Sequence, residues 1–174
     1  MRVTICSSSN NLISDEYKKI GRKVAELLAS SNYDLNWGCA STSIMGICYE
    51  EFNKKNRKIY GYTTKKYEND IKNLPNAVCN IYDTTFDLKK NLFNDADIII
   101  FLPGGTGTVS ELFSDLEEVR SNDVDKKIII YNENNYYDSL INMIDNMVKA
   151  NFNDASIYDY FEVLNNIDEL KKII

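Results

Sequence analysis

Three glycines stand together in the segment Pro103-Gly104-Gly105-Thr106-Gly107-Thr108-Val109-Ser110-Glu111. An unbroken apolar run precedes them, and a helical pattern follows over residues 108–120. Glycine permits positive φ angles and close approach of the backbone, so several N–H groups can point into one concavity. The N-terminus of the following helix adds partial positive charge, and Thr108 adds a hydroxyl. The segment therefore predicts an anion site, most naturally for a phosphate; a glycine-rich turn without a ligand is the alternative.

The same segment argues against three familiar chemistries. Gly107 is followed by Thr108 rather than lysine, which excludes a Walker-type NTP loop, and the dinucleotide spacing G-x-G-x-x-G is absent. Pyridoxal phosphate chemistry needs a Schiff-base lysine, and none lies in or beside Pro103–Thr108. A single phosphate held by backbone amides, without Mg²⁺, fits the residues better. We therefore expect no cofactor and no metal.

Glu111 lies about one turn into the predicted helix, close to the anion. A first-turn glutamate commonly complements the helix dipole. A carboxylate there can also stabilise a developing oxocarbenium ion or activate water, as in glycosidic bond cleavage. Its position alone leaves both interpretations open.

Two features of the composition narrow the remaining chemistry. The chain has no histidine, which excludes Ser-His-Asp and Cys-His catalysis and most zinc sites. A general base must then be a carboxylate, a lysine, a tyrosine or a thiolate. The four cysteines contain no C-x-x-C pair, so we expect reduced and mostly buried thiols.

The elements that must position these residues alternate between short apolar runs and longer helical patterns. Strands are predicted over residues 3–6, 33–37, 58–62, 77–82, 96–102, 127–131 and 160–164. Helices are predicted after an N-cap at Ser14, over residues 44–52, 85–94, 108–120 and 137–150, and from Ile167. Such alternation is typical of a doubly wound, mostly parallel α/β sheet flanked by helices, a Rossmann-like three-layer sandwich. Ligands should bind beyond the carboxyl ends of the strands, in the loops after strands one, two, four and five.

Length and charge set the broad class. The 174 residues, 44% of them hydrophobic, predict a single nucleotide-binding domain spanning 1–174. A net charge of -6 argues against a nucleic-acid polymer as partner. The chain has no apolar run of ~18 residues and no signal peptide after Met1, so we expect a cytoplasmic protein that contacts no membrane.

The motif Pro103–Glu111 resembles the P-G-G-x-G-T-x-x-E signature of the Lonely Guy phosphoribohydrolases, many of which are labelled lysine-decarboxylase-like. Three further segments resemble that family: Ile5–Ser9 its first strand and turn, Trp37–Gly46 its glycine-rich second loop, and Tyr136–Leu140 the start of a later helix. The resemblance implies a Rossmann-like homodimer. It also implies cleavage of the N-glycosidic bond of a nucleoside 5′-monophosphate, giving free base and ribose 5-phosphate.

The resemblance also implies a set of site residues. Glu111 would be the catalytic carboxylate. The residues expected to bind phosphate and substrate are Gly104, Gly105, Thr106, Gly107, Thr108, Ser7, Ser8, Gly38 and Met45. By this resemblance, Leu88 occupies the position of the family's arginine, which leaves Lys89 as the candidate cation. Lys90 is interpreted as a solvent-exposed charge on the helix.

Other departures fall at glycine positions of the family: Cys39, Ala40 and Ser43 in the second loop, and Ser7 in the first turn. Since arginine is a rigid planar donor that lysine does not replace, two functions stay open. One is the hydrolase; the other is a catalytically weak or inactive nucleotide-binding sensor or carrier of the same fold.

Two predicted helices carry more apolar side chains than a lone domain needs. These are Leu112, Phe113 and Leu116 on one, and Ile141, Ile144 and Met147 on the other. With the family resemblance they predict a twofold homodimer formed by helices near the site.

Overall fold

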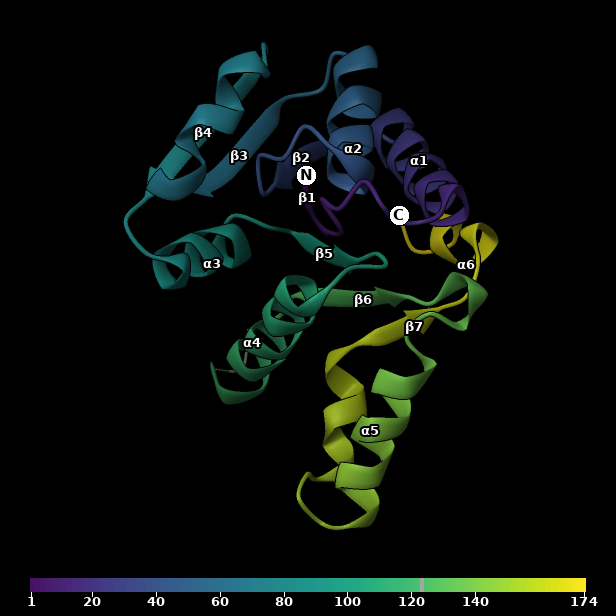
Figure 1. Cartoon of the computed structure of the whole chain (residues 1–174). Coiled ribbons are helices and arrows are strands. Elements are labelled where there is room, and N and C mark those ends of the chain that lie inside the picture. The colour runs from purple at the N-terminus through teal and green to yellow at the C-terminus, as the bar shows by residue number, and fades with distance from the viewer. Residues whose placement is uncertain (123) are drawn as a thin grey trace.

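The computed structural model describes residues 1–122 and 124–174, with the side chains of residues 70, 72 and 73 left out of the description. Seven parallel strands form one sheet in the order β4-β3-β2-β1-β5-β6-β7 (Figure 1). The strands are β1 (Arg2–Cys6), β2 (Asp34–Trp37), β3 (Ile59–Thr64), β4 (Ala77–Tyr82), β5 (Ile98–Phe101), β6 (Lys127–Tyr131) and β7 (Glu162–Leu164). The α-helices are α1 (Asp15–Ser30), α2 (Ser43–Lys54), α3 (Thr85–Asn94), α4 (Thr106–Asn122), α5 (Asp138–Lys149) and α6 (Ile167–Lys171).

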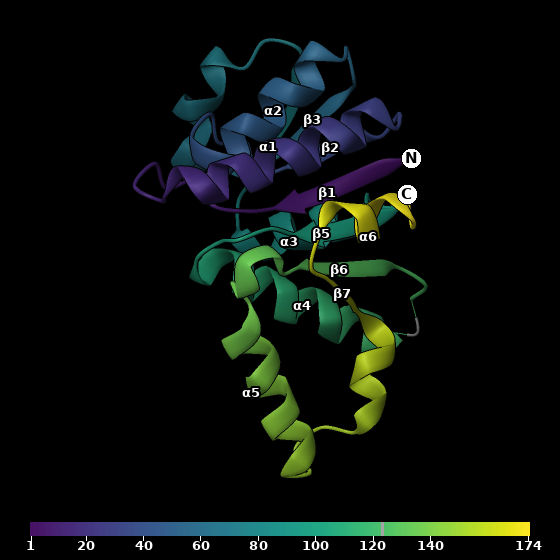
Figure 2. The same ribbon diagram turned by 90° about the vertical axis from the view of Figure 1, so that its right-hand side faces the viewer.

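Helices cover both faces of the sheet, which confirms the predicted doubly wound α/β fold. One face packs against α1, α2 and α6, and the other against α3, α4 and part of α5 (Figures 1 and 2). The apolar run of β5 is buried along its whole length, because a central parallel strand is covered on both faces. Beyond the sheet, α5 and the 3₁₀ segment Ala155–Tyr160 project together as an arm (Figures 1 and 2).

Every predicted strand and helix is present, with boundaries within two residues of the prediction. Helix α4 begins at Thr106, two residues earlier than predicted, so Gly107 and Thr108 lie in its first turn. Strand β7 begins at Glu162 rather than residue 160, because the chain before it forms the 3₁₀ segment. A further 3₁₀ helix, Lys65–Asn73, was not predicted; its residues are strongly polar.

The strand order places the topological switch point between β1 and β5. The chain winds from β1 toward β4 on one side and from β5 toward β7 on the other, so the loops after β1 and β5 diverge. A crevice is expected at that divergence, at the carboxyl ends of the strands. Over the described ranges, we find no helix long and apolar enough to cross a membrane.

Candidate functional site

A cavity of about 520 Å³ opens at this switch point. Its lining comes from the loop after β1 (Ser7–Asn10), the loop after β2 (Gly38–Thr42), the start of α4, and side chains of α2 and α3. The loops after strands one, two and five are thus brought together as predicted. The loop after β4 contributes no described residue, which corrects the sequence prediction: β4 is the edge strand, three strands from β1. Tyr67, which follows β3, lines the cavity instead.

The N-terminus of α4 faces this cavity with Gly105, Thr106, Gly107 and Thr108. The first N–H groups of a helix have no partner within the helix, so they are available to an anion. A Cβ atom built at Gly105 or Gly107 meets nothing within 4 Å, which shows that both residues border open space. The two glycines therefore leave room for a ligand close to the backbone.

The expected role of positive φ in these glycines is wrong: none of the described glycines has a positive φ. Gly104 is required for a different reason, since a Cβ there would lie 2.2 Å from Thr108 Oγ1. Gly104 does not line the main cavity but a smaller neighbouring one of about 250 Å³, together with Pro103, Tyr17 and Tyr136. Close packing, rather than a left-handed backbone, explains the glycine at 104.

The Ser7 hydroxyl is buried without a hydrogen-bond partner among the described residues. The residue is buried at the end of β1 and lines the cavity. Buried hydroxyls are nearly always paired, so an unpaired one at a cavity wall indicates a ligand or water there. Ser8, Gly38 and Met45 also line the cavity, as the resemblance implies.

The two loops that carry these residues are tied together. The backbone N–H of Met45 donates to the carbonyl of Ser8 (3.2 Å). Thr42 Oγ1 donates to the carbonyl of Ser9 (2.7 Å), and Ser43 Oγ to that of Asn10 (2.8 Å). A displacement of one loop is therefore transmitted to the other.

Cys39 and Ser43, which we predicted to replace glycines of the family, have backbone conformations typical of glycine. Their φ angles are 61° and 56°, in the left-handed region that side chains other than glycine rarely adopt. Such conformations cost on the order of 1–3 kcal/mol and collect at functional sites.

Glu111 lies in the cavity wall between a thiol and an ammonium group. The Cys6 thiol is hydrogen-bonded to its carboxylate. On α3, Lys89 Nζ donates to Ser110 Oγ at 2.7 Å, beside Glu111. Burial raises the pKa of Glu111, and the Cys6 hydrogen bond and the Lys89 charge oppose that rise. Leu88, which we predicted to replace the family's arginine, packs against the apolar core on this side of the sheet, and the charge of Lys89 acts on Glu111.

Asp115 forms a second carboxyl group one helical turn behind Glu111. Residues four apart on a helix share a face, and Asp115 is 5% exposed. Burial, followed by the charge of Glu111, raises its pKa to about 8, although Lys126 and Lys89 oppose the shift. Asp115 is therefore mostly protonated at pH 7. Sequence reasoning missed both Asp115 and the role of Cys6, because neither belongs to the motif.

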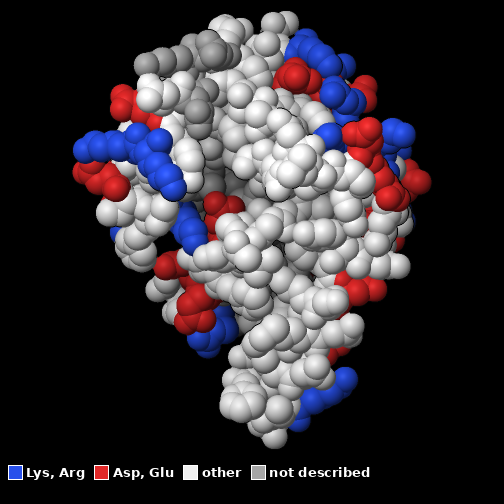
Figure 3. All heavy atoms as spheres, viewed as in Figure 1, with Lys and Arg blue, Asp and Glu red and all other residues white. Residues whose placement is uncertain are grey.

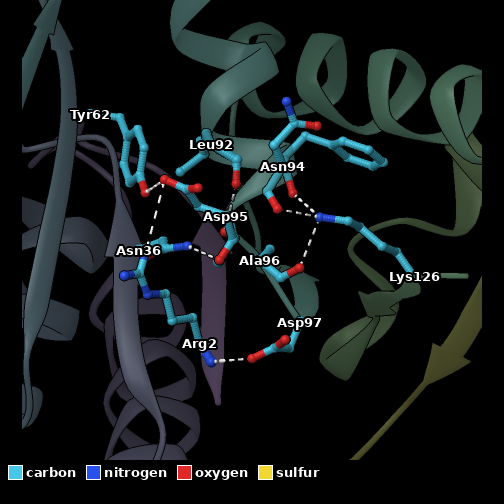
Figure 4. A network of polar contacts seen from close by, with 11 residues as sticks. Arg2, Asn36, Tyr62, Leu92, Asn94, Asp95, Ala96, Asp97 and Lys126 are labelled. Atoms are coloured by element: carbon cyan, nitrogen blue, oxygen red, sulfur yellow. Dashed lines mark hydrogen bonds and ion pairs between the residues drawn. The ribbon is translucent and has the colours of Figure 1, made fainter. Parts of the chain in front are cut away.

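Helix α3, which carries Lys89 and Leu92, is fixed to the sheet at its C-terminal end (Figure 4). Lys126 Nζ donates to the carbonyls of Phe93, Asn94 and Ala96, and Asn36 Nδ2 donates to that of Asp95. The last carbonyls of a helix lack partners within it and carry negative partial charge, so a lysine there is stabilising. The network holds the C-terminal end of α3, the helix that carries Lys89, in place against the sheet.

Two adjacent tyrosines fix the segment before α4. Tyr137 Oη donates to the carbonyl of Leu102 (2.6 Å), and Tyr136 Oη to that of Gly104 (2.7 Å). These two contacts give a structural reason for the Tyr-Tyr pair that resembles the family's.

In the space-filling view, acidic atoms lie in a recess near the centre of the face, with basic atoms beside them (Figure 3).

Comparison with known proteins agrees with this architecture. Residues 45–174 match the family described as "Possible lysine decarboxylase". A cytokinin riboside 5′-monophosphate phosphoribohydrolase of Arabidopsis thaliana is 28% identical over 151 residues, covering 84% of this chain and 68% of the relative.

Two solved structures share the fold. The molybdenum cofactor binding protein of Rippkaea orientalis has a TM-score of 0.68 at 15% identity, covering 99% of this chain and 96% of the other. The molybdenum cofactor carrier protein of Chlamydomonas reinhardtii has a TM-score of 0.67 at 9% identity, covering 98% and 96%. The family match spans most of the chain and agrees with the motif, so the chain belongs to the possible lysine decarboxylase family, that of the Lonely Guy phosphoribohydrolases.

Proposed function

We propose that this protein hydrolyses the N-glycosidic bond of a nucleoside 5′-monophosphate, giving free base and ribose 5-phosphate. The observation that carries the proposal is the placement of Glu111 in the same cavity as the open N-terminus of α4. The relative named above, a phosphoribohydrolase of a riboside 5′-monophosphate, supports it. The alternative suggested by the family's description, decarboxylation through a Schiff-base lysine, is disfavoured because no lysine is among the described residues lining the cavity.

The spacing along α4 suits a ribose 5-phosphate. The phosphate would accept hydrogen bonds from the N–H groups of Thr106, Gly107 and Thr108, with the unpaired Ser7 hydroxyl as a further donor. Glu111 is five residues after Thr106, a rise of about 7.5 Å along the axis, and helical side chains lean back toward the N-terminus. Its carboxylate then lies about one ribose away from the phosphate, beside the anomeric carbon.

Each group near that carbon would have a defined part in the reaction. The bond from C1′ to the base nitrogen breaks, and positive charge develops on C1′ and the ring oxygen. The Glu111 carboxylate stabilises that charge and accepts a proton from the attacking water. The leaving base takes a proton from solvent, and Glu111 afterwards returns its proton to solvent, so one water is consumed in all. The Cys6 thiol and the Lys89 charge favour the ionised form of Glu111, because both oppose the rise in its pKa that burial causes.

Purified protein with AMP and related nucleoside monophosphates tests the proposal, with free base and ribose 5-phosphate measured by chromatography. We expect release of base by the wild type. Glu111→Gln should reduce it by on the order of 10²-fold or more while AMP binding persists, because backbone amides hold the phosphate. Absence of base release from every monophosphate by folded wild type, or full activity in Glu111→Gln, would refute it.

A binding module is the second candidate, favoured by Leu88 in place of the family's arginine. Both solved structures compared above belong to proteins named for binding or carrying the molybdenum cofactor. Calorimetry separates the candidates: micromolar AMP binding with no turnover, unchanged in Glu111→Ala, supports a sensor or carrier.

We also propose that the protein is a homodimer, although the surface differs from the sequence prediction. Leu112, Leu116 and Ile144 are buried in the chain's own core, in the apolar cluster on the α3 and α4 side of the sheet. Phe113 remains 37% exposed and Met143 55%, and a groove of about 210 Å³ lies between α4, α5 and the segment Ala155–Tyr160. The projecting arm shows few charged atoms in Figure 3, as an interface between copies requires.

A further inference from the structure

Two thiols meet at the wall of the cavity. Cys39, in the loop after β2, donates its S–H to Cys79 on edge strand β4, with 3.3 Å between the sulfur atoms. Strand β3 runs between β2 and β4, and its residue Gly61 lies next to both sulfur atoms. A Cβ at Gly61 would lie 2.1 Å from the Cys39 sulfur and 2.6 Å from that of Cys79. The absence of a side chain at Gly61 is therefore what lets the two sulfurs meet across the strand.

We propose that Cys39 and Cys79 are a modification site, which a low-molecular-weight disulfide oxidises to an intramolecular disulfide that reshapes the cavity. This inference does not depend on the hydrolase activity, because it concerns the thiols and the shape of the cavity wall.

The two cysteines have different roles in the oxidation. Cys79 is partly exposed, and the hydrogen bond from Cys39 lowers its pKa, so Cys79 is the attacking thiolate. It attacks one sulfur of the oxidant RSSR, forming a Cys79–SR mixed disulfide and releasing RSH. Cys39 then loses its proton and attacks the Cys79 sulfur, forming the Cys39–Cys79 bond and releasing the second RSH. Two thiols are oxidised and one external disulfide is reduced.

The other two cysteines have different surroundings. Cys6 is buried and hydrogen-bonded to Glu111. Cys48 is buried in α2, and burial, with the nearby Glu51, raises its pKa to about 12. A thiol that stays protonated and enclosed is a poor nucleophile. Oxidation should therefore be selective for Cys39 and Cys79.

Closing the bond moves a residue of the cavity wall. A disulfide holds its sulfurs ~2.05 Å apart, so the two atoms must approach by about 1.2 Å. Cys39 lines the cavity and sits in a left-handed conformation, and its loop is hydrogen-bonded to the loop of Ser8, Ser9 and Asn10. Displacements of ~1 Å in positioning elements can change rates by 10²-fold. We expect oxidation to weaken binding of a nucleoside monophosphate by about tenfold, since Cys39 lies in the cavity wall and takes no part in breaking the glycosidic bond.

The test uses full-length protein incubated with oxidised glutathione, followed by intact mass, free-thiol counting and mapping of linked peptides. We expect the wild type to lose two of its four thiols in a Cys39–Cys79 link, reversed by dithiothreitol. Cys48→Ser is the matched control and should form the same link. Cys79→Ser should form none, and Cys39→Ser should stop at the glutathione adduct on Cys79.

Affinity for AMP, measured by calorimetry before and after oxidation, gives the second readout, with oxidised Cys79→Ser as control. Failure of reduced wild type to bind AMP would count against the proposed function and leave the thiol result standing; 8-anilinonaphthalene sulfonate fluorescence would then report the change in the cavity. A stable glutathione adduct on wild-type Cys79 without internal closure, a link involving Cys6 or Cys48, or a disulfide that leaves AMP affinity and dye fluorescence unchanged would overturn the inference.

Discussion

Asp115→Asn should stabilise the protein, and by more as the pH rises. The carboxyl is buried on α4 and, within the described part of the chain, receives no hydrogen bond or ion pair. Its pKa is about 8 in the folded protein, against an ordinary value of 3.8. Between these values the unfolded chain releases the proton and the folded chain retains it, so the free energy of unfolding falls with rising pH. Asparagine has nearly the same shape and carries no proton to release.

The size of the effect follows from the pH interval. Each pH unit in which only the unfolded state is ionised lowers the free energy of unfolding by about 1.4 kcal/mol. From about pH 5.5 to 8.5, the advantage of the variant over the wild type should therefore grow by about 3 kcal/mol. With a urea dependence of about 2 kcal/mol/M, the difference between their unfolding midpoints should grow by about 1.5 M.

Urea unfolding followed by circular dichroism at several pH values measures this difference. Glu26→Gln is the control: it neutralises an exposed acid on α1 and should change stability by no more than about 0.5 kcal/mol. A midpoint difference between Asp115→Asn and wild type that is the same at both pH values would refute the reasoning, because Asp115 would then titrate as in the unfolded chain. If the hydrolase proposal is correct, the variant should also keep most of its turnover at pH 7, where the wild-type carboxyl is neutral.

Two further predictions concern the cation and the assembly. Lys89→Ala should lower kcat by about tenfold and move the acidic limb of the pH–rate profile to higher pH, because Lys89 opposes the rise in the pKa of Glu111. Lys90→Ala, an exposed neighbour, should leave the profile unchanged, and equal effects of the two variants would contradict a specific role for Lys89. Sedimentation at micromolar concentration should give twice the chain mass of 20.0 kDa, and Phe113→Glu should halve it. A wild-type mass of one chain would refute the dimer.

The sequence alone was enough to predict the fold class and the segment that faces the cavity. Strands and helices leave local patterns: the run Ile98–Leu102 could only be a covered strand, and the glycines after it could only precede a helix or a turn. The alternation of the two patterns then implies parallel strands and a crevice at their carboxyl ends. Placing Lys89 near Glu111 needed the family resemblance as well, because the two residues belong to different helices.

Only the tertiary structure decided which side chains surround Glu111 and what their charges are. In the sequence, Cys6 resembles any buried thiol and Asp115 any acidic residue of a helix. Their pKa values could not be predicted, because a pKa depends on burial and on neighbouring charges that only the folded chain brings close. The contact of Cys39 with Cys79 likewise depends on β3 lying between β2 and β4 and on Gly61 lacking a side chain. Local patterns specify elements, whereas the strand order brings distant residues together, and no short segment of the chain encodes that order.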